Sequence, residues 1–125
     1  MSESLVETLE LENNLTLELF DRSKQIAGDR WQITLIAQLE VPVDPSVADI
    51  REVDWDKIKA VLGASLMFEQ KRERNFIGAE DKDVVFQSLC EHFKTTQMPY
   101  LSHPEFAKRY ILSRYSEHHH KFGRA

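Results

Sequence analysis

The chain has 125 residues, of which 42% are hydrophobic and 30% charged, and its formal net charge at pH 7 is −5. These proportions are typical of one soluble globular domain and exclude two full-sized ones, so we expect a single domain spanning residues 1–125. No stretch approaches the roughly 18 to 20 uncharged apolar residues of a membrane span, and residues 1–12 lack the features of a signal peptide. The sequence therefore predicts a cytoplasmic protein with no membrane contact.

Two segments in the first third of the chain have the alternation of β-strands. From Trp31 to Val43, apolar residues at odd positions alternate with mostly polar ones, which predicts a strand with one face in water. Leu15 to Phe20 shows the same period, and the connection 22–30 contains Gly28, so we expect an antiparallel hairpin with a long loop. Residues 9–11 are expected to add a short edge strand, and residues 1–8 to form a disordered N-terminus.

The middle of the chain predicts one short helix and one long strand. Pro42 and Pro45 end the strand before them, because proline cannot donate to a sheet. Asp54 is the predicted N-cap of a helix over 55–62, and Gly63 its expected left-handed end. Residues 66–77 are apolar at both ends and charged in the centre. We interpret them as a strand at an open or edge position, with a helix as the alternative because Glu, Gln, Lys and Arg favour helices.

Two helices are predicted to close the chain. Residues 80–96 place Val85, Leu89 and Phe93 on one face. Ser102 to Glu105 has the form of a capping box, which predicts the start of the last helix, and residues 118–125 are expected to be its frayed tail. The predicted fold is α+β, an antiparallel sheet of three to four strands covered on one face by the two C-terminal helices, in the order β-β-α-β-α-α.

The residues that most often carry catalysis or bind metals are poorly arranged in this sequence. Cys90 and His92 lie two positions apart and point away from each other on a helix, and Cys90 adjoins the apolar face, so we expect a buried, unreactive thiol. The other histidines are His103 and the run 118–120, whose spacing offers weak chelation. We therefore expect no catalytic residue, metal or other cofactor, although whether the histidine run is native and functional is left open.

The charged centre of residues 66–77 is the best candidate binding site. In a strand, Gln70, Arg72, Arg74 and Phe76 share one face, which can bind a carboxylate, a phosphate or nucleic acid. The alternative is that the two arginines pair across the sheet with acidic residues, Glu18 or Glu40. The net charge of −5 disfavours nucleic acid as the partner.

Residues 69–78 (EQKRERNFIG), residues 99–106 (PYLSHPEF) and the later pair 114–115 resemble a small family of bacterial α+β proteins with no established function. The resemblance covers the C-terminal half and implies a bacterial cytoplasmic domain. It implies no catalytic residue.

The leading functional hypothesis is a non-enzymatic binding or regulatory module that recognises a protein or a small anionic ligand through the open sheet face or an edge strand. The alternative is a small enzyme or ligand-binding protein with a pocket formed by Arg72, Tyr100 and His103, where a general base and an anion clamp meet. A homodimer through an edge strand is a further expectation.

Overall fold

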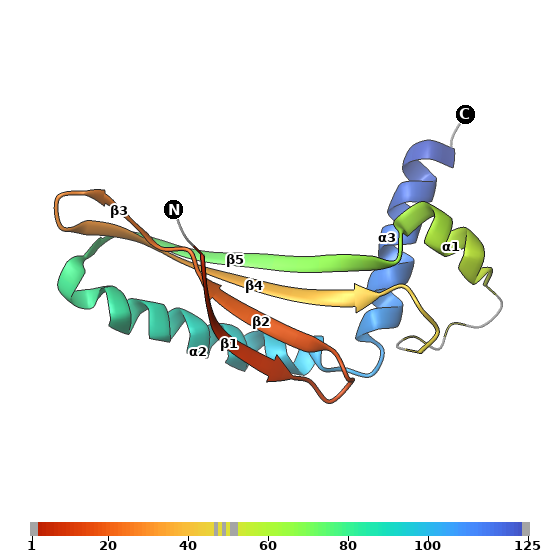
Figure 1. The fold of residues 1–125 in the computed structure, drawn as a ribbon, viewed down its shortest axis with the longest axis horizontal. Helices are drawn as coiled ribbons and strands as arrows, with labels where there is room; N and C mark the ends of the chain where they lie inside the picture. Colours follow the sequence, from red (N-terminus) through yellow and green to blue (C-terminus); the bar gives the residue numbers. More distant parts are fainter. Residues whose placement is uncertain (1–2, 47, 49, 51–52, 124–125) are drawn as a thin grey trace.

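The structure is a computed structural model that describes residues 3–46, 48, 50 and 53–123, of which 119–123 are described by their backbone alone. It is an α+β fold with a five-stranded antiparallel sheet and three α-helices (Figure 1). In chain order the elements are β1 (Ser4–Glu10), β2 (Thr16–Asp21), β3 (Lys24–Ala27), β4 (Arg30–Pro42), α1 (Trp55–Leu62), β5 (Ser65–Gly78), a 3-10 turn (Ala79–Asp81), α2 (Lys82–Leu101) and α3 (Phe106–Gly123).

β4 is the centre of the sheet. β5 pairs with it along its whole length, from Arg30 opposite Gly78 to Pro42 opposite Ser65. β2 and β3 therefore share the other edge of β4, and β1 adds outside β2. The strands that pair on one side only are thus β1, β3 and β5.

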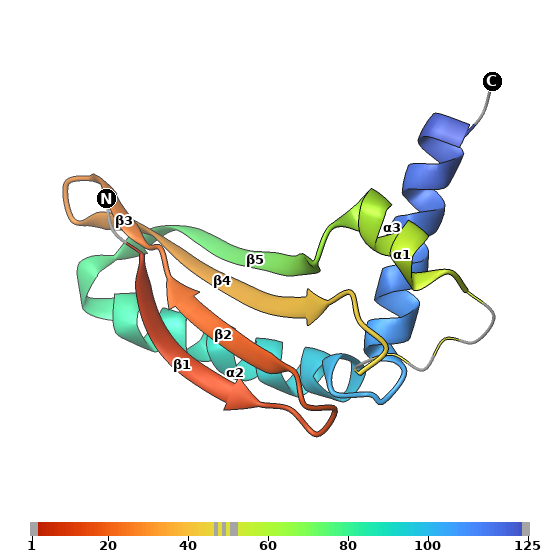
Figure 2. The ribbon, with the colours of Figure 1, turned by 45° about the vertical axis from the view of Figure 1, so that its right-hand side comes forward.

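The alternation predicted for β4 sets which face of the sheet is covered. Its odd residues from Ile33 to Val41 are buried and face α2, which runs along that side of the sheet (Figures 1 and 2). The opposite face carries polar residues such as Gln38 and Glu40, together with two residues that are themselves buried, Thr34 and Ile36. One covered face and one open face result.

The last helix does not lie where the sequence predicted. Figures 1 and 2 show α2 beneath the sheet and α3 standing across its end, beside α1. Phe106 of α3 is buried there, with its ring centroid 5.5 Å from that of Phe68 on β5. The expectation that both C-terminal helices cover one sheet face is therefore correct for α2 and wrong for α3.

The observed order β-β-β-β-α-β-α-α also corrects the predicted β-β-α-β-α-α. The additional strands are β1, which is longer than the predicted edge strand, and β3, which lies within the expected loop 22–30. β3 forms because the chain turns back at Gly28, at φ 55°, and pairs Lys24 with Gln32. Residues 66–77 do form the predicted strand rather than the alternative helix.

The predicted capping box at Ser102 does not form. Ser102 instead ends α2, where its hydroxyl donates to the Met98 carbonyl at 2.6 Å. The first turn before α3 is held by His103, whose Nδ1 accepts from the Glu105 amide at 3.0 Å. α2 consequently extends five residues beyond the predicted Thr96, with Pro99 inside its last turn.

The structure also describes the start of α1 and most of the two chain ends. Asp54 caps α1 as expected, accepting from the Lys57 amide at 3.3 Å. Of the two segments expected to be disordered or frayed, residues 4–8 lie in β1 and residues 118–123 in α3. Residues 1, 2, 124 and 125 of these segments lie outside the described residues. No helix in the described part of the chain is long and apolar enough to cross a membrane.

Candidate functional site

The two predicted binding arginines lie on the helix-covered side of β5. Arg72 is opposite Leu35 and half-buried, and its guanidinium carbon lies 5.4 Å from the centroid of the Phe93 ring of α2. Arg74 is opposite Ile33 and exposed. Their side chains donate to the carbonyls of the preceding residues, at 3.2 Å and 3.0 Å respectively.

The alternative pairing of these arginines with Glu18 or Glu40 is wrong. Glu18 is opposite Gln38 and Glu40 opposite Met67, and these pairs point to the open face of the sheet. Cross-strand pairs form only between side chains on the same face. Within the described residues neither arginine forms an ion pair, so the guanidinium of Arg74 is available to a ligand.

Phe76 does not continue the arginine face as predicted. The register shifts between the Ile33–Arg74 and Trp31–Ile77 pairs, so that Asn75 and Phe76 both lie opposite Gln32. This β-bulge holds Phe76 at φ 60°, and its side chain is 71% exposed. A bulge breaks the two-residue period, which is why alternation alone misplaced this residue.

The proposed trio of Arg72, Tyr100 and His103 lines none of the hollows described below. Tyr100 packs edge-on against Phe106, with the ring centroids 5.2 Å apart. The His103 carbonyl accepts from the Asn13 side chain, which ties the α2–α3 turn to the turn after β1. The contacts of Tyr100 and His103 are those of fold-stabilising residues at that turn.

The structure instead brings Arg74 together with a different histidine. A groove of about 470 Å³ lies between the end of β5 and the first half of α2. Its lining is mainly apolar, with Arg74 and His92 as its basic groups: Arg74, Ile77, Val84, Val85, Ser88, Leu89 and His92. Its volume falls within the range of small-molecule pockets, and its walls combine apolar side chains with a few polar groups.

The sequence contained a partial signal for this groove. Val85, Ser88 and His92 are spaced at three and four residues, which places them on one helix face. The second wall could not be predicted, because the pairing of Ile77 with Trp31 across the bulge fixes where Arg74 lies beside that face.

Cys90 is buried between α2 and the sheet, as predicted, with 3% of its surface exposed. Burial raises the pKa of its thiol, and the neighbouring Lys94 offsets only part of this effect. A thiol held in its neutral form is a poor nucleophile, so Cys90 acts as a small apolar core residue.

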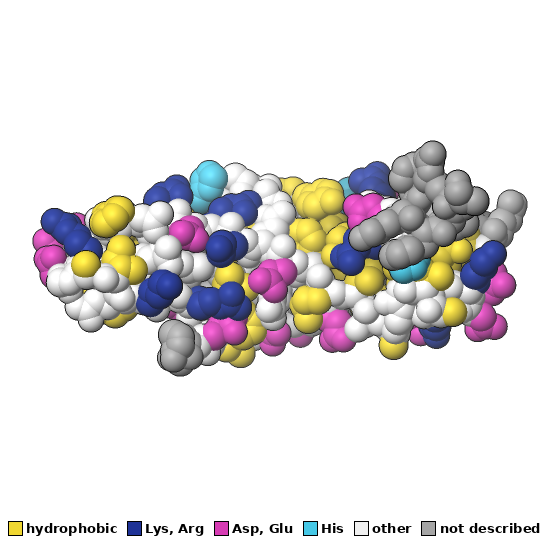
Figure 3. Space-filling model, turned by 90° about the horizontal axis from the view of Figure 1, so that it is seen from above, with side chains coloured by type: hydrophobic (Ala, Val, Ile, Leu, Met, Phe, Trp, Pro, Cys, Tyr) yellow, Lys and Arg dark blue, Asp and Glu magenta, His cyan; other side chains and the backbone are white. Residues whose placement is uncertain are grey.

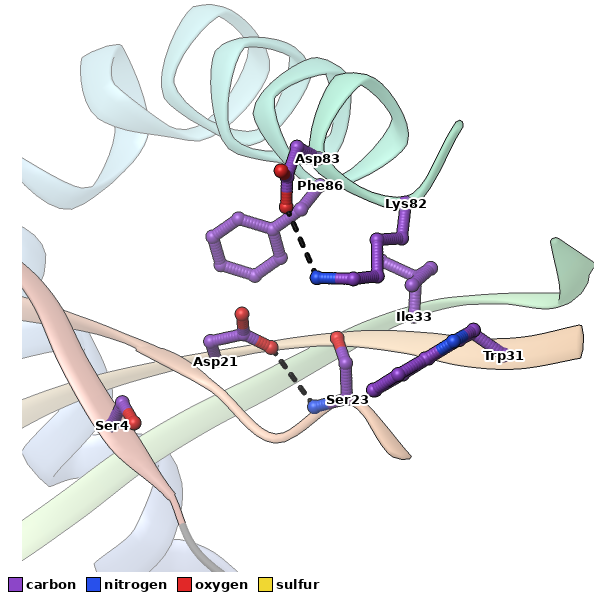
Figure 4. A pocket seen from close by; sticks show the side chains of 8 residues that line it. All are labelled: Ser4, Asp21, Ser23, Trp31, Ile33, Lys82, Asp83 and Phe86. Carbon is purple, nitrogen blue, oxygen red and sulfur yellow. Dashed lines mark hydrogen bonds and ion pairs between the residues drawn. The ribbon is translucent and has the colours of Figure 1, made fainter. Parts of the chain in front are cut away.

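A second, polar hollow of about 130 Å³ lies between the start of α2 and the strands β1, β2 and β4 (Figure 4). Its charged groups already have partners. Lys82 lies 5.0 Å from the Trp31 ring centroid and 3.4 Å from the Asp83 carboxylate, and Asp21 accepts from the Ser23 amide at 2.9 Å. This small hollow therefore offers a ligand no charged group that lacks a partner within the protein.

Among the described residues, no three His, Cys, Asp or Glu side chains lie close enough together to hold a metal ion. The side chains of His119 and His120 lie outside this description.

Comparison with known proteins assigns no family. No model of a known protein family matches the chain, and neither a curated protein nor a solved structure matches it.

Proposed function

We propose that the protein is a non-enzymatic binding module for a small anionic ligand with an apolar body, and that the ligand lies in the groove between β5 and α2. The observation that carries this proposal is one mainly apolar groove whose lining includes Arg74 and His92. The aliphatic side chains would bury the ligand's body, and the guanidinium would bind its carboxylate.

The distribution of charge supports a small ligand over a long polyanion. Viewed from above, Lys and Arg side chains are interspersed with Asp and Glu on the same face of the molecule (Figure 3). Lys71, for example, lies 3.4 Å from Glu73. Nucleic-acid binding relies on a continuous basic surface, whereas one carboxylate needs only one or two cationic groups.

The proposal is tested by titrating the ¹⁵N-labelled protein with octanoate and, separately, with octanol. We expect saturable amide shifts confined to residues 74–77 and 84–92, with octanoate binding more tightly. Arg74→Gln should weaken octanoate binding roughly tenfold, because a hydrogen bond to a charged group is lost, and should leave octanol binding unchanged. Arg109→Gln, an exposed arginine on α3, is the matched control.

Val84→Asp tests the apolar wall. Val84 is 71% exposed, so the fold tolerates the change, but an acid in the groove should abolish binding of octanoate. Shifts that map elsewhere, or octanoate binding that is insensitive to both Arg74→Gln and Val84→Asp, would contradict the proposal.

A further inference from the structure

The outer edge of β5 pairs with no strand in the described part of the chain. Backbone groups in an antiparallel strand point alternately to its two sides. The Val43 amide donates to the Ala64 carbonyl at 2.9 Å, which shows that even-numbered residues of this strand direct their backbone groups toward β4. The backbone groups of Glu69, Lys71 and Glu73 therefore point to the free edge.

This free edge has a defined length. At one end, the hydroxyl of Tyr110 on α3 donates to the Met67 carbonyl at 3.3 Å, so α3 already contacts the edge there. At the other end the bulge at Asn75 and Phe76 interrupts the strand. Residues 69–74 remain as a regular segment that pairs with no other strand, and two of its edge carbonyls, those of Lys71 and Glu73, accept from the side chains of Arg72 and Arg74.

The charges of this segment are complementary to those of a second, antiparallel copy in one register. A two-fold axis at Gln70 places Glu69 opposite Lys71 of the second copy, twice, and creates no like-charge pair. An axis at Lys71 would place Lys71 opposite itself and Glu69 opposite Glu73. An axis at Arg72 would place Arg72 opposite itself. Like charges directly opposite each other destabilise a strand pair.

Gln70 supplies an independent observation at the same position. Its side-chain Oε1 is buried and has no hydrogen-bond partner, the only such side-chain atom found among the described residues. Even-numbered residues would form the non-hydrogen-bonded pairs across the new ladder, where side chains approach most closely. On a two-fold axis, the two Gln70 amides would offer each other a donor and an acceptor.

We propose that two copies of the chain associate through the free edges of β5, antiparallel about a two-fold axis at Gln70, to give a sheet that continues across the dimer. With the axis at Gln70 the ladder is limited to residues 69–71 of each copy, because Glu73 would fall opposite Met67, whose carbonyl accepts from Tyr110 of α3. The ladder is therefore short, so the dimer should be reversible and depend on concentration. The groove lies between β5 and α2 rather than at the strand edge, and this inference does not rest on the function proposed for it.

Sedimentation equilibrium over a wide concentration range tests the dimer and its register. Glu69→Lys and Lys71→Glu each turn two opposite-charge pairs into like-charge pairs and should raise the dimer Kd roughly tenfold or more. The double variant Glu69→Lys with Lys71→Glu restores opposite charges and should return the Kd to near that of the unmodified protein. Glu12→Lys, an exposed site in the turn after β1, is the matched control.

Circular dichroism establishes that each variant is folded before its Kd is compared. A protein that stays monomeric at all concentrations overturns the proposal, as does a dimer that neither single reversal weakens. A dimer weakened by Lys71→Glu but not by Glu69→Lys overturns the Gln70 register, because that pattern belongs to an axis at Arg72.

Discussion

Phe76 lies in a backbone conformation that is unfavourable for any residue with a β-carbon. Its φ of 60° is a left-handed conformation that costs a residue with a β-carbon about 1 to 2 kcal/mol, and glycine almost nothing. With 71% of the side chain exposed, little burial offsets this cost. We predict that Phe76→Gly is about 1 kcal/mol more stable than Phe76→Ala in urea unfolding, because only glycine relieves the strain. A glycine variant less stable than the alanine variant would show that the backbone is not strained there.

At this scale the sequence predicted the neighbours of Phe76 better than Phe76 itself. The two-residue period correctly placed Arg72 and Arg74 on one face, because regular pairing extends as far as Arg74. The burial of Cys90 as a small apolar residue was also predicted correctly, from its position beside the apolar face of α2. The sequence did not predict that His92 and Arg74 line the same groove. Their proximity depends on how far β5 extends past the start of α2.

At the scale of elements, the strand that a segment can pair with overrides the segment's own propensity. The residues at the centre of β5 favour a helix, yet they form a strand because β4 offers a partner for the whole segment. At the end of α2, by contrast, the sequence predicted too early a helix end. Pro99 was expected beyond the helix, but proline in a last turn removes a single hydrogen bond, and the Ser102 hydroxyl supports that turn through Met98.

An ion pair joins β1 to α2 across the two layers. Lys94 Nζ lies 3.1 Å from a carboxylate oxygen of Glu7, and this hydrogen bond is the main reason that the pKa of Lys94 is raised. We predict that Glu7→Gln lowers the free energy of unfolding by about 0.5 kcal/mol at pH 7. Because the pKa of Lys94 is raised in the folded state, this contribution is complete below the pKa of an ordinary lysine, about 10.4, and is lost as the pH rises through the folded value.

Urea unfolding of both proteins from pH 7 to 11 measures this difference. Glu105→Gln, which removes a more exposed pair between the turn before α3 and Lys108 of α3, serves as the control and should have a smaller effect. A difference that is unchanged at the alkaline end would exclude the ion pair as its source.

For the whole molecule, the sequence predicted the class of fold and the face that packs, but not where the last helix lies. The apolar residues of α3 are compatible with the sheet face or with its end. The choice depends on Phe68 and on α1, which lie far from α3 in sequence and meet it only in the folded state. Local patterns carry no information about such contacts.

This arrangement predicts how the two ends of the molecule unfold. Phe106 is 1% exposed and joins β5, the end of α2 and α3, so Phe106→Ala should lower the free energy of unfolding by about 3 to 5 kcal/mol. The loss should be global, because the same buried cluster continues from Phe106 along the sheet.

The two tryptophans report the two ends, since Trp31 packs near the start of α2 and Trp55 begins α1. In Trp31→Phe and Trp55→Phe backgrounds, the fluorescence of the remaining tryptophan should give coincident transitions, both shifted equally by Phe106→Ala. If only the Trp55 signal shifts, the α1–α3 end unfolds as a separate unit and the single-core description fails.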